Sequence, residues 1–175
     1  MFPISLNLAA VPILLVGEGE AFAKRKAQLE AAGAGKLIYR NAFNAYDLED
    51  VTVVMVVGLD YDTSSYIARL AREDGKLVNV EDVPELCDFY FTSFVQRGEL
   101  TISVSTGGAS PTLAKRVREK IAVCFPEVWT ERTAMIKALR DRLRGEGKSM
   151  REVMVETDKF IDGQAWIPAC AGIKQ

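Results

Sequence analysis

VPILLVGEGEAFAKRKAQLEAAGAG, residues 11–35, decides the fold. Its first part, Val11 to Val16, is almost wholly apolar and ends at Gly17, which is typical of a strand buried on both faces of a parallel sheet. A run of strong helix formers follows, and Gly33 and Gly35 are expected to end that helix. The stretch therefore predicts a strand, a glycine turn and a helix.

The next segments continue this alternation. Strands are predicted at Lys36–Tyr39 (KLIY), Val51–Val57 (VTVVMVV) and Lys76–Val80 (KLVNV). Thr63–Glu73 is predicted to be a helix, with Asp62 or Thr63 as its N-cap. Because crossovers between parallel strands are right-handed, this order indicates an α/β fold with a Rossmann-like parallel sheet.

After Asp82 the pattern changes. Leu100–Ser105 (LTISVS) alternates like a strand with one solvated face, and the chain from Thr112 onward is mostly helical in pattern. We therefore predict a nucleotide-binding domain at residues 1–82, a dimerisation or linker segment at 83–111, and a helical C-terminal domain at 112–175. The tail from Phe160 to Gln175 has weak periodicity, and its role is left open.

Composition excludes several classes of function. The formal net charge of −2 gives no overall field that would attract nucleic acid or membrane. The apolar N-terminus, Met1–Val16, has no basic n-region and is too short to span a bilayer. Three widely spaced cysteines (Cys87, Cys124 and Cys170) show no metal-binding spacing and suggest reduced thiols in a cytoplasmic protein.

The sequence contains no histidine. This excludes a Ser-His-Asp hydrolase and a zinc hydrolase of the histidine type, and no metal site is expected. Any proton transfer must then use a carboxylate, Lys, Tyr, Cys or water.

The glycine turn is a candidate dinucleotide site. Gly17 would make the tight turn, and Gly19 would let the pyrophosphate approach the backbone at the helix N-terminus. The third position of a GxGxxG pattern is Phe22, so either Ala21 or Ala23 supplies the close helix–strand contact or the site is degraded. A strand–helix turn without any ligand is the alternative.

Charges near this turn oppose a phosphate. Glu18 and Glu20 place carboxylates beside the turn, and these would repel a bound phosphate if their side chains point inward. The second strand is also not followed by an acidic residue for the ribose until Asp47. Arg40 would either contact a phosphate or lie on the surface as an ordinary arginine.

One long stretch carries a family resemblance. LVNVEDVPELCDFYFTSFVQRGELTISVSTGGASPTLAKRVREKI, Leu77–Ile121, resembles the precorrin-2 dehydrogenase family, which includes the N-terminal module of fused siroheme synthases. The shared motifs are N-V-x-D, C-D-F, Q-R-G-x-L-x-I-x-V-S, T-G-G-A-S-P and L-A-x-x-V-R-E-K, all in order. Between residues 36 and 51 this chain is shorter than the family pattern, as if a strand and its loop were missing.

The resemblance implies an NAD-dependent oxidation of precorrin-2 to sirohydrochlorin by a homodimer. It places the catalytic carboxylate at Asp82, at the carboxyl end of a strand, where it would accept a proton. The residues expected to bind the cofactor are Gly17, Gly19, Glu20, Ala21, Phe43 and Asn44. Those expected to bind the substrate are Thr106, Gly107, Gly108 and Ser110.

Plainer interpretations stay open. Asp82 taken alone is a solvated strand-end residue, and the Thr106–Pro111 loop is a helix cap without a ligand. From residue 112 to 151, eleven Lys and Arg residues stand against five Asp and Glu residues, which suits a polycarboxylated tetrapyrrole but also an ordinary solvated helix face. Two other functions remain: a sirohydrochlorin ferrochelatase, and a non-catalytic tetrapyrrole-binding module whose NAD site has decayed.

Overall fold

The computed structural model describes residues 2–164 and 166. The chain divides into two compact units, Met1–Phe91 and Thr92–Gln175. The first unit thus continues past Asp82, and the three-part division at residues 82 and 111 stays a prediction. Most of the tail beyond Phe160 lies outside the described residues.

The first unit is built on a four-stranded parallel sheet in the order β2-β1-β3-β4. In register, Ile13 lies opposite both Leu37 and Val53, and Val53 lies opposite Leu77. The strands are β1 (Ile13–Gly17), β2 (Leu37–Arg40), β3 (Val53–Val57) and β4 (Leu77–Val80). All four overlap predicted strands, with ends that differ by at most two residues, and the α/β fold class is confirmed.

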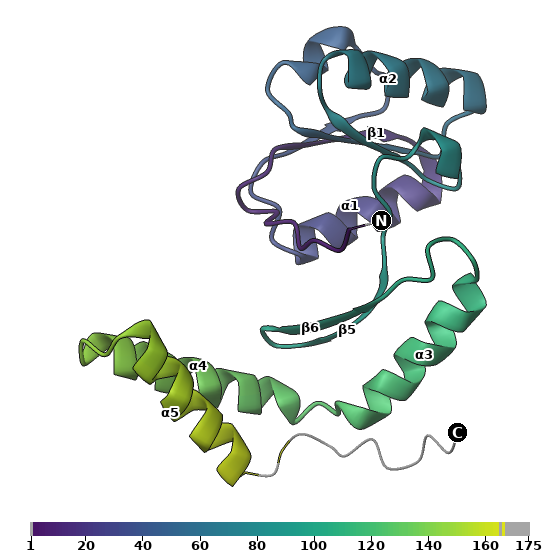
Figure 1. Cartoon of the computed structure of the whole chain (residues 1–175). Coiled ribbons are helices and arrows are strands. Elements are labelled where there is room, and N and C mark those ends of the chain that lie inside the picture. Colours follow the sequence, from purple (N-terminus) through teal and green to yellow (C-terminus); the bar gives the residue numbers. More distant parts are fainter. Residues whose placement is uncertain (1, 165, 167–175) are drawn as a thin grey trace. The chain divides into compact units, whose positions relative to one another are not determined.

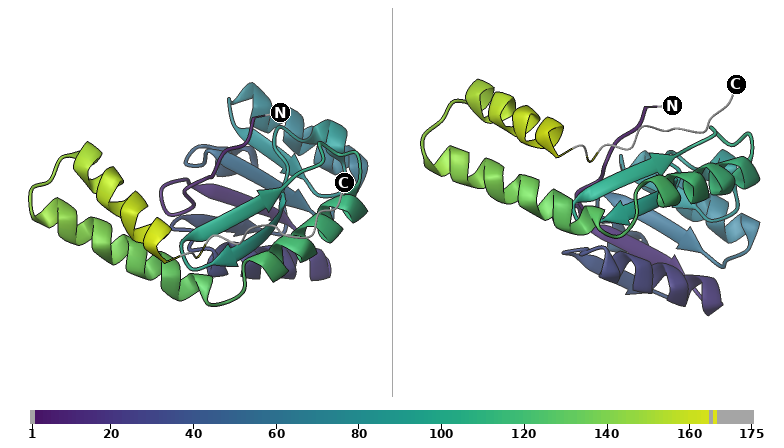
Figure 2. Two further views of the ribbon diagram at one scale, coloured as in Figure 1. Left: turned by 60° about the horizontal axis from the view of Figure 1, so that its bottom comes forward. Right: turned by 90° about the horizontal axis from the view of Figure 1, so that it is seen from below.

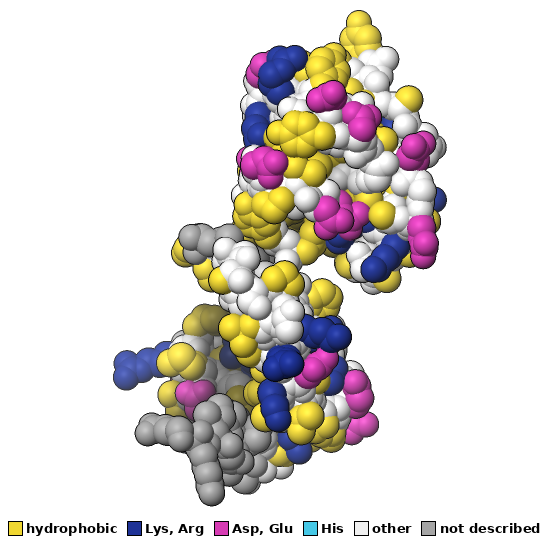
Figure 3. All heavy atoms as spheres, turned by 90° about the vertical axis from the view of Figure 1, so that its right-hand side faces the viewer, with side chains coloured by type: hydrophobic (Ala, Val, Ile, Leu, Met, Phe, Trp, Pro, Cys, Tyr) yellow, Lys and Arg dark blue, Asp and Glu magenta, His cyan; other side chains and the backbone are white. Residues whose placement is uncertain are grey.

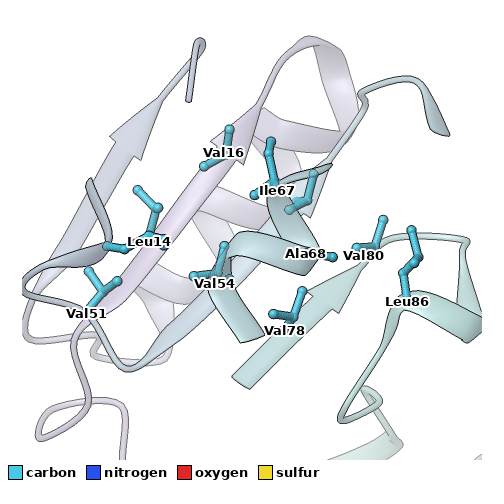
Figure 4. Packing of buried hydrophobic residues seen from close by; sticks show 12 residues of the cluster. Leu14, Val16, Val51, Val54, Ile67, Ala68, Val78, Val80 and Leu86 are labelled. Carbon is cyan, nitrogen blue, oxygen red and sulfur yellow. The ribbon is translucent and has the colours of Figure 1, made fainter. Parts of the chain in front are cut away.

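Two helices cover opposite faces of this sheet (Figure 1). They are α1 (Gly19–Ala31) and α2 (Tyr61–Glu73). Even-numbered strand residues such as Leu14 and Val54 pack with Ile67 and Ala68 of α2 (Figure 4). Odd-numbered residues of β1 and β3 pack instead with Leu29 of α1. The sheet is buried on both faces, which explains why its strands have nearly continuous apolar sequences.

The start of α2 differs from the prediction. Asp60 is the N-cap, and neither Asp62 nor Thr63 takes that role. The Asp60 carboxylate accepts hydrogen bonds from the Thr63 backbone N–H at 2.9 Å and from its hydroxyl at 2.7 Å. These bonds, led by the one from the backbone N–H, lower the pKa of Asp60. Thr63 therefore lies inside the first turn of α2, where its hydroxyl donates to Asp60 and does not act as the N-cap.

The crossover from β2 to β3 contains a short 3₁₀ helix, η1 (Ala45–Leu48), in place of an α-helix. Leu48 is buried in the cluster between the sheet and α2, and Phe43 packs against the same cluster. A second short 3₁₀ helix, η2 (Pro84–Leu86), follows β4. The abbreviated sequence between residues 36 and 51 is therefore a compact connection that still returns the chain to the sheet.

The second unit pairs an antiparallel hairpin with helices (Figure 2). The hairpin is β5 (Ser93–Arg97) and β6 (Leu100–Val104), and the helices are α3 (Pro111–Cys124), α4 (Trp129–Gly145) and α5 (Met150–Gly163). The sequence predicted β6 and the helical character after residue 112, but it did not predict β5. Among the described residues, no helix is long and apolar enough to cross a membrane.

Candidate functional site

Two glycines bring the carboxyl ends of β1 and β3 together. A Cβ atom on Gly17 would overlap the Val57 carbonyl oxygen, and one on Gly58 would overlap the carbonyl oxygen of Glu18. The Glu18 backbone N–H also donates to the Val57 carbonyl at 3.2 Å. Since β1 is followed by β2 on one side and flanked by β3 on the other, this is the switch point of the sheet, where doubly wound folds bind ligands.

The N-terminus of α1 opens directly from this crossing. Glu18 is its N-cap but makes no side-chain capping bond, so no side chain covers the first backbone N–H groups. Gly19 has a φ of +77°, and a Cβ there would meet nothing within 4 Å. Glu20 and Ala21 are exposed in the first turn. Backbone donors, open space and the helix dipole together favour an anion at this position.

Phe22 corrects one expectation. Neither Ala21 nor Ala23 supplies the helix–sheet contact, because both are exposed. Phe22 itself is partly buried and packs against the cluster formed by β1, β3 and Leu29. The large side chain at the third position of the glycine pattern therefore provides the packing that a small residue usually allows.

The end of β2 is organised around Asp47. The Arg40 Nε donates to Asp47 Oδ1 at 2.7 Å, and the Asn44 backbone N–H donates to Asp47 Oδ2 at 3.0 Å. The Asp47 side chain is only 9% exposed. Both oxygens of the Asp47 carboxylate are thus used to close the loop after β2, and Arg40, the last residue of β2, is ion-paired with it.

Phe43 and Asn44, the two residues of this loop that were predicted to bind the cofactor, both have contacts within the protein. The Asn44 side chain accepts a hydrogen bond from the Tyr46 N–H at 3.0 Å, and the Phe43 ring stands edge-on to Tyr66 with centroids 6.4 Å apart. Asn41, which sequence reasoning missed, donates from its Nδ2 to the Gly17 carbonyl at 3.0 Å. Its place directly after β2, at the carboxyl end of the strand, is the signal that could have identified it.

Asp82 lies just beyond the carboxyl end of β4, where the Glu81 N–H extends the ladder to the Val56 carbonyl at 2.9 Å. It is exposed and has a φ of +61°, the one non-glycine residue with positive φ among those described. Its side chain makes no hydrogen bond or ion pair within the described part of the chain. Aspartate adopts this region more readily than most non-glycine residues, and such backbone positions are often found at functional sites.

The Cys87-Asp88-Phe89 motif covers the outer edge of β4. The Cys87 thiol accepts from the Val80 N–H at 3.3 Å and donates to the Val80 carbonyl at 3.1 Å. Asp88 accepts from the Val78 N–H at 2.8 Å and from Arg72 Nε at 2.9 Å. Burial raises the pKa of the Cys87 thiol, which keeps it protonated and able to donate at neutral pH. This part of the family pattern therefore serves the fold.

The Thr106–Pro111 loop belongs to the second unit. The Thr106 hydroxyl bonds both the N–H and the carbonyl of Ser110, at 3.1 and 3.2 Å, and the Ser110 hydroxyl caps α3 by accepting from Leu113 N–H at 3.1 Å. Gly107 and Gly108 have φ of +62° and +89°, and a Cβ at either would meet nothing within 4 Å. The two predicted hydroxyls are thus occupied within the loop, while the glycines leave its outer side open.

Metal ligands are not gathered in one place. Within the part of the chain that the structure describes, no group of three or more His, Cys, Asp or Glu side chains is arranged to hold a metal ion.

Two family models match the chain. "Sirohaem biosynthesis protein central" matches residues 97–123, and "Putative NAD(P)-binding" matches residues 35–93. Together they cover β2 to β4, β6 and most of α3. They support a nicotinamide cofactor and do not distinguish NAD from NADP.

Curated relatives agree with these models. A siroheme synthase of Methylococcus capsulatus is 32% identical over 81% of this chain and 34% of the relative. One of Ectopseudomonas mendocina is 30% identical over 93% of this chain and 39% of the relative. The chain thus spans between a third and two fifths of the siroheme synthases that it matches.

A solved structure has the same fold. The chain matches "SirC, precorrin-2 dehydrogenase" with a TM-score of 0.75 and 22% identity, over 97% of this chain and 94% of the other. The resemblance seen in Leu77–Ile121 is therefore confirmed by models, relatives and fold.

Proposed function

The chain is a relative of the siroheme synthases, and on this premise we propose that it oxidises precorrin-2 to sirohydrochlorin with NAD as the oxidant. The observation that carries the proposal is Asp82, an exposed carboxylate with a φ of +61° at the carboxyl end of β4. The sheet, the switch point and the matched family models supply its context.

The residues at the switch point fit the pyrophosphate of a dinucleotide. Gly19 leaves open space at the start of α1, and the first N–H groups of that helix have no side-chain cap. We assign Gly17, Gly19, Glu20 and Ala21 to this part of the cofactor and the loop with Phe43 and Asn44 to its ribose side. Glu18 and Glu20 are exposed, so their carboxylates are free to turn towards solvent and avoid the phosphates.

Asp82 is assigned the proton-transfer step. The nicotinamide, when bound, accepts the hydride that leaves the macrocycle. A proton must also leave the substrate, and the Asp82 carboxylate accepts it, since the chain has no histidine to do so. The absence of a side-chain partner to Asp82 among the described residues leaves both of its oxygens available.

Substrate binding is assigned to the second unit. The outer side of the loop with Gly107 and Gly108 is open, and it leads into the N-terminus of α3. On the face of the second unit seen in Figure 3, Lys and Arg side chains gather. A polycarboxylated tetrapyrrole is attracted by this surplus of positive charge.

We further propose a homodimer that pairs through the β5–β6 hairpin. One face of the hairpin is exposed: the register places Phe94 opposite Ser103 and Gln96 opposite Thr101, and all four residues are exposed or partly so. Phe94 is 57% exposed. A two-stranded ribbon with an open apolar residue gains stability by burying that face.

A titration tests the cofactor half of the proposal. Purified protein is titrated with NAD and with NADP by calorimetry, and precorrin-2 is then supplied with the better ligand. Binding and the appearance of sirohydrochlorin absorbance support the function. Failure of both nucleotides to bind at millimolar concentration would discard it. In that case, faster metal insertion into sirohydrochlorin with the protein than without it would favour the ferrochelatase.

A further inference from the structure

Resting on the function proposed above, we propose that Arg25 is a positioning residue that holds Asp82 in place through Glu81. Arg25 lies in the middle of α1, the helix whose N-terminus faces the cofactor site. Glu81 is the residue directly before Asp82. Neither side chain is assigned a contact with the cofactor or the substrate.

The contact between them is direct and partly shielded. Arg25 Nη2 lies 2.8 Å from Glu81 Oε1, and the two side chains are 16% and 26% exposed. A second ion pair, Arg72 of α2 with Asp88, also reaches the segment after β4, but it lies farther along the chain from Asp82. Partial burial weakens solvent screening, so this Arg25–Glu81 pair contributes more than a fully exposed pair of the same length.

The same guanidinium also holds the far end of the segment that follows β4. Its carbon lies 3.9 Å from the centroid of the Phe91 ring, and Nη1 donates to Gln28 of the same helix at 3.1 Å. Arg25 therefore contacts both Glu81 and Phe91, the first and last residues of the segment 81–91. A planar guanidinium can make both contacts at once, whereas a lysine ammonium cannot.

Asp82 depends on such support. Its own side chain has no partner within the described chain, and its left-handed backbone is less favourable than the right-handed regions, although aspartate tolerates it better than most residues with a Cβ. A strained conformation persists only when its surroundings fix it. Before Asp82 in the chain, Glu81 is held by its N–H bond to the Val56 carbonyl and by its carboxylate, which pairs with Arg25. After Asp82, the Val83 N–H donates to the Val80 carbonyl at 3.3 Å and closes a turn. Removing Arg25 frees the first of these anchors.

Hydrogen exchange tests the positioning without any assay of activity. Arg25→Met is expected to speed amide exchange in residues 81–91 by about tenfold or more and to leave β1 and β3 unchanged. Arg69→Met is the matched control, because Arg69 also pairs with a glutamate, at 2.7 Å, and lies over a tyrosine ring, at 5.6 Å, but on α2. Unchanged exchange in residues 81–91 would overturn the proposal, whether or not the protein proves to be a dehydrogenase.

Kinetics then test the link to Asp82. Arg25→Met and Glu81→Gln are each expected to lower kcat by about tenfold or more, because a small displacement of a reacting group is costly. The KM for precorrin-2 and the Kd for NAD are expected to change by less than about twofold, since neither side chain is assigned a ligand contact. Arg25→Lys should restore part of kcat through its charge.

The double variant separates positioning from general damage. If Arg25 acts through Glu81, combining Arg25→Met with Glu81→Gln lowers kcat no further than either change alone. A double variant whose loss in kcat is the product of the two single losses would contradict the proposal. So would a loss of NAD affinity large enough to explain the whole fall in activity. An inactive wild type that still shows the exchange result would instead refute the proposed reaction and leave the anchoring of segment 81–91 standing.

Discussion

Asp82 combines an exposed carboxylate, the proton acceptor proposed above, with a left-handed backbone. At its φ of +61°, glycine pays no steric penalty, aspartate pays little because its side chain tolerates this region, and alanine pays most. At this position glycine is therefore expected to suit the backbone best, but it removes the carboxylate that the proposed reaction needs.

Replacing Asp82 tests this link. Asp82→Gly is expected to unfold with a free energy about 1 kcal/mol higher than Asp82→Ala, because only the alanine carries a Cβ into the left-handed region. Both variants are expected to lose sirohydrochlorin formation. Urea unfolding gives the first quantity and the rise of sirohydrochlorin absorbance the second. Appreciable turnover by Asp82→Gly would remove Asp82 from the proton-transfer step.

The two glycines of the turn should respond differently to the same methyl group. Gly17→Ala is expected to prevent stable folding, since its Cβ would overlap the Val57 carbonyl in the centre of the sheet. Gly19→Ala is expected to fold, with a cost of about 1 kcal/mol for its φ of +77°, because its Cβ meets no atom. Circular dichroism and thermal melting distinguish them, and calorimetry on Gly19→Ala should show weaker NAD binding. Equal melting temperatures for the two variants would contradict the close crossing of β1 and β3.

At the scale of elements, β4 shows how a short motif completes a sheet. Within the described residues no strand pairs with its outer edge, and the side chains of Cys87 and Asp88 bond its backbone instead. An edge completed in this way depends on particular side chains, so it is sensitive to single substitutions.

Asp88→Ala probes that edge. The change leaves the Val78 N–H and the Arg72 guanidinium without their acceptor, and a loss of about 1–3 kcal/mol in the free energy of unfolding is expected. Glu85→Ala is the control, because Glu85 is exposed and no bond to its side chain is recorded within the described residues. Denaturant unfolding checks both. A variant of Asp88 as stable as that of Glu85 would show that water satisfies the edge equally well.

The elements also show how far the sequence predicts this molecule. β1, β3 and both covering helices were predictable because apolar periodicity and glycine boundaries are local signals. The cap at Asp60, the packing of Phe22 and the strand β5 were not, since each depends on a partner whose choice is made by the tertiary structure. In the candidate site, the positions of Gly19 and Asp82 were predicted by motif, while the pairing of Arg40 with Asp47 and of Arg25 with Glu81 needed the folded chain.

At the scale of the whole molecule, the proposed dimer gives the second unit a role beyond its own small core. Phe94 is exposed on the hairpin, while Val95 on the opposite face is buried. The hairpin is thus amphipathic, with one face already packed and the other free to pair.

Sedimentation equilibrium tests the dimer. Wild-type protein is expected to sediment as a dimer, and Phe94→Glu is expected to shift it towards monomer because a charge would be buried in the interface. Tyr46→Glu serves as control, since Tyr46 is 78% exposed on η1 in the first unit. A monomeric wild type, or a dimer unaffected by Phe94→Glu, would place the assembly surface elsewhere or remove it.

The covered edge of β4 has a consequence for the protein at high concentration. A parallel sheet with a bare outer strand is a template on which a second molecule can add its own strand, the first step towards fibrils. Here one border is already sealed by Cys87 and Asp88, and the other is the four-residue β2, which ends in the charged Arg40. Precipitation on heating is therefore expected to follow global unfolding and not to precede it.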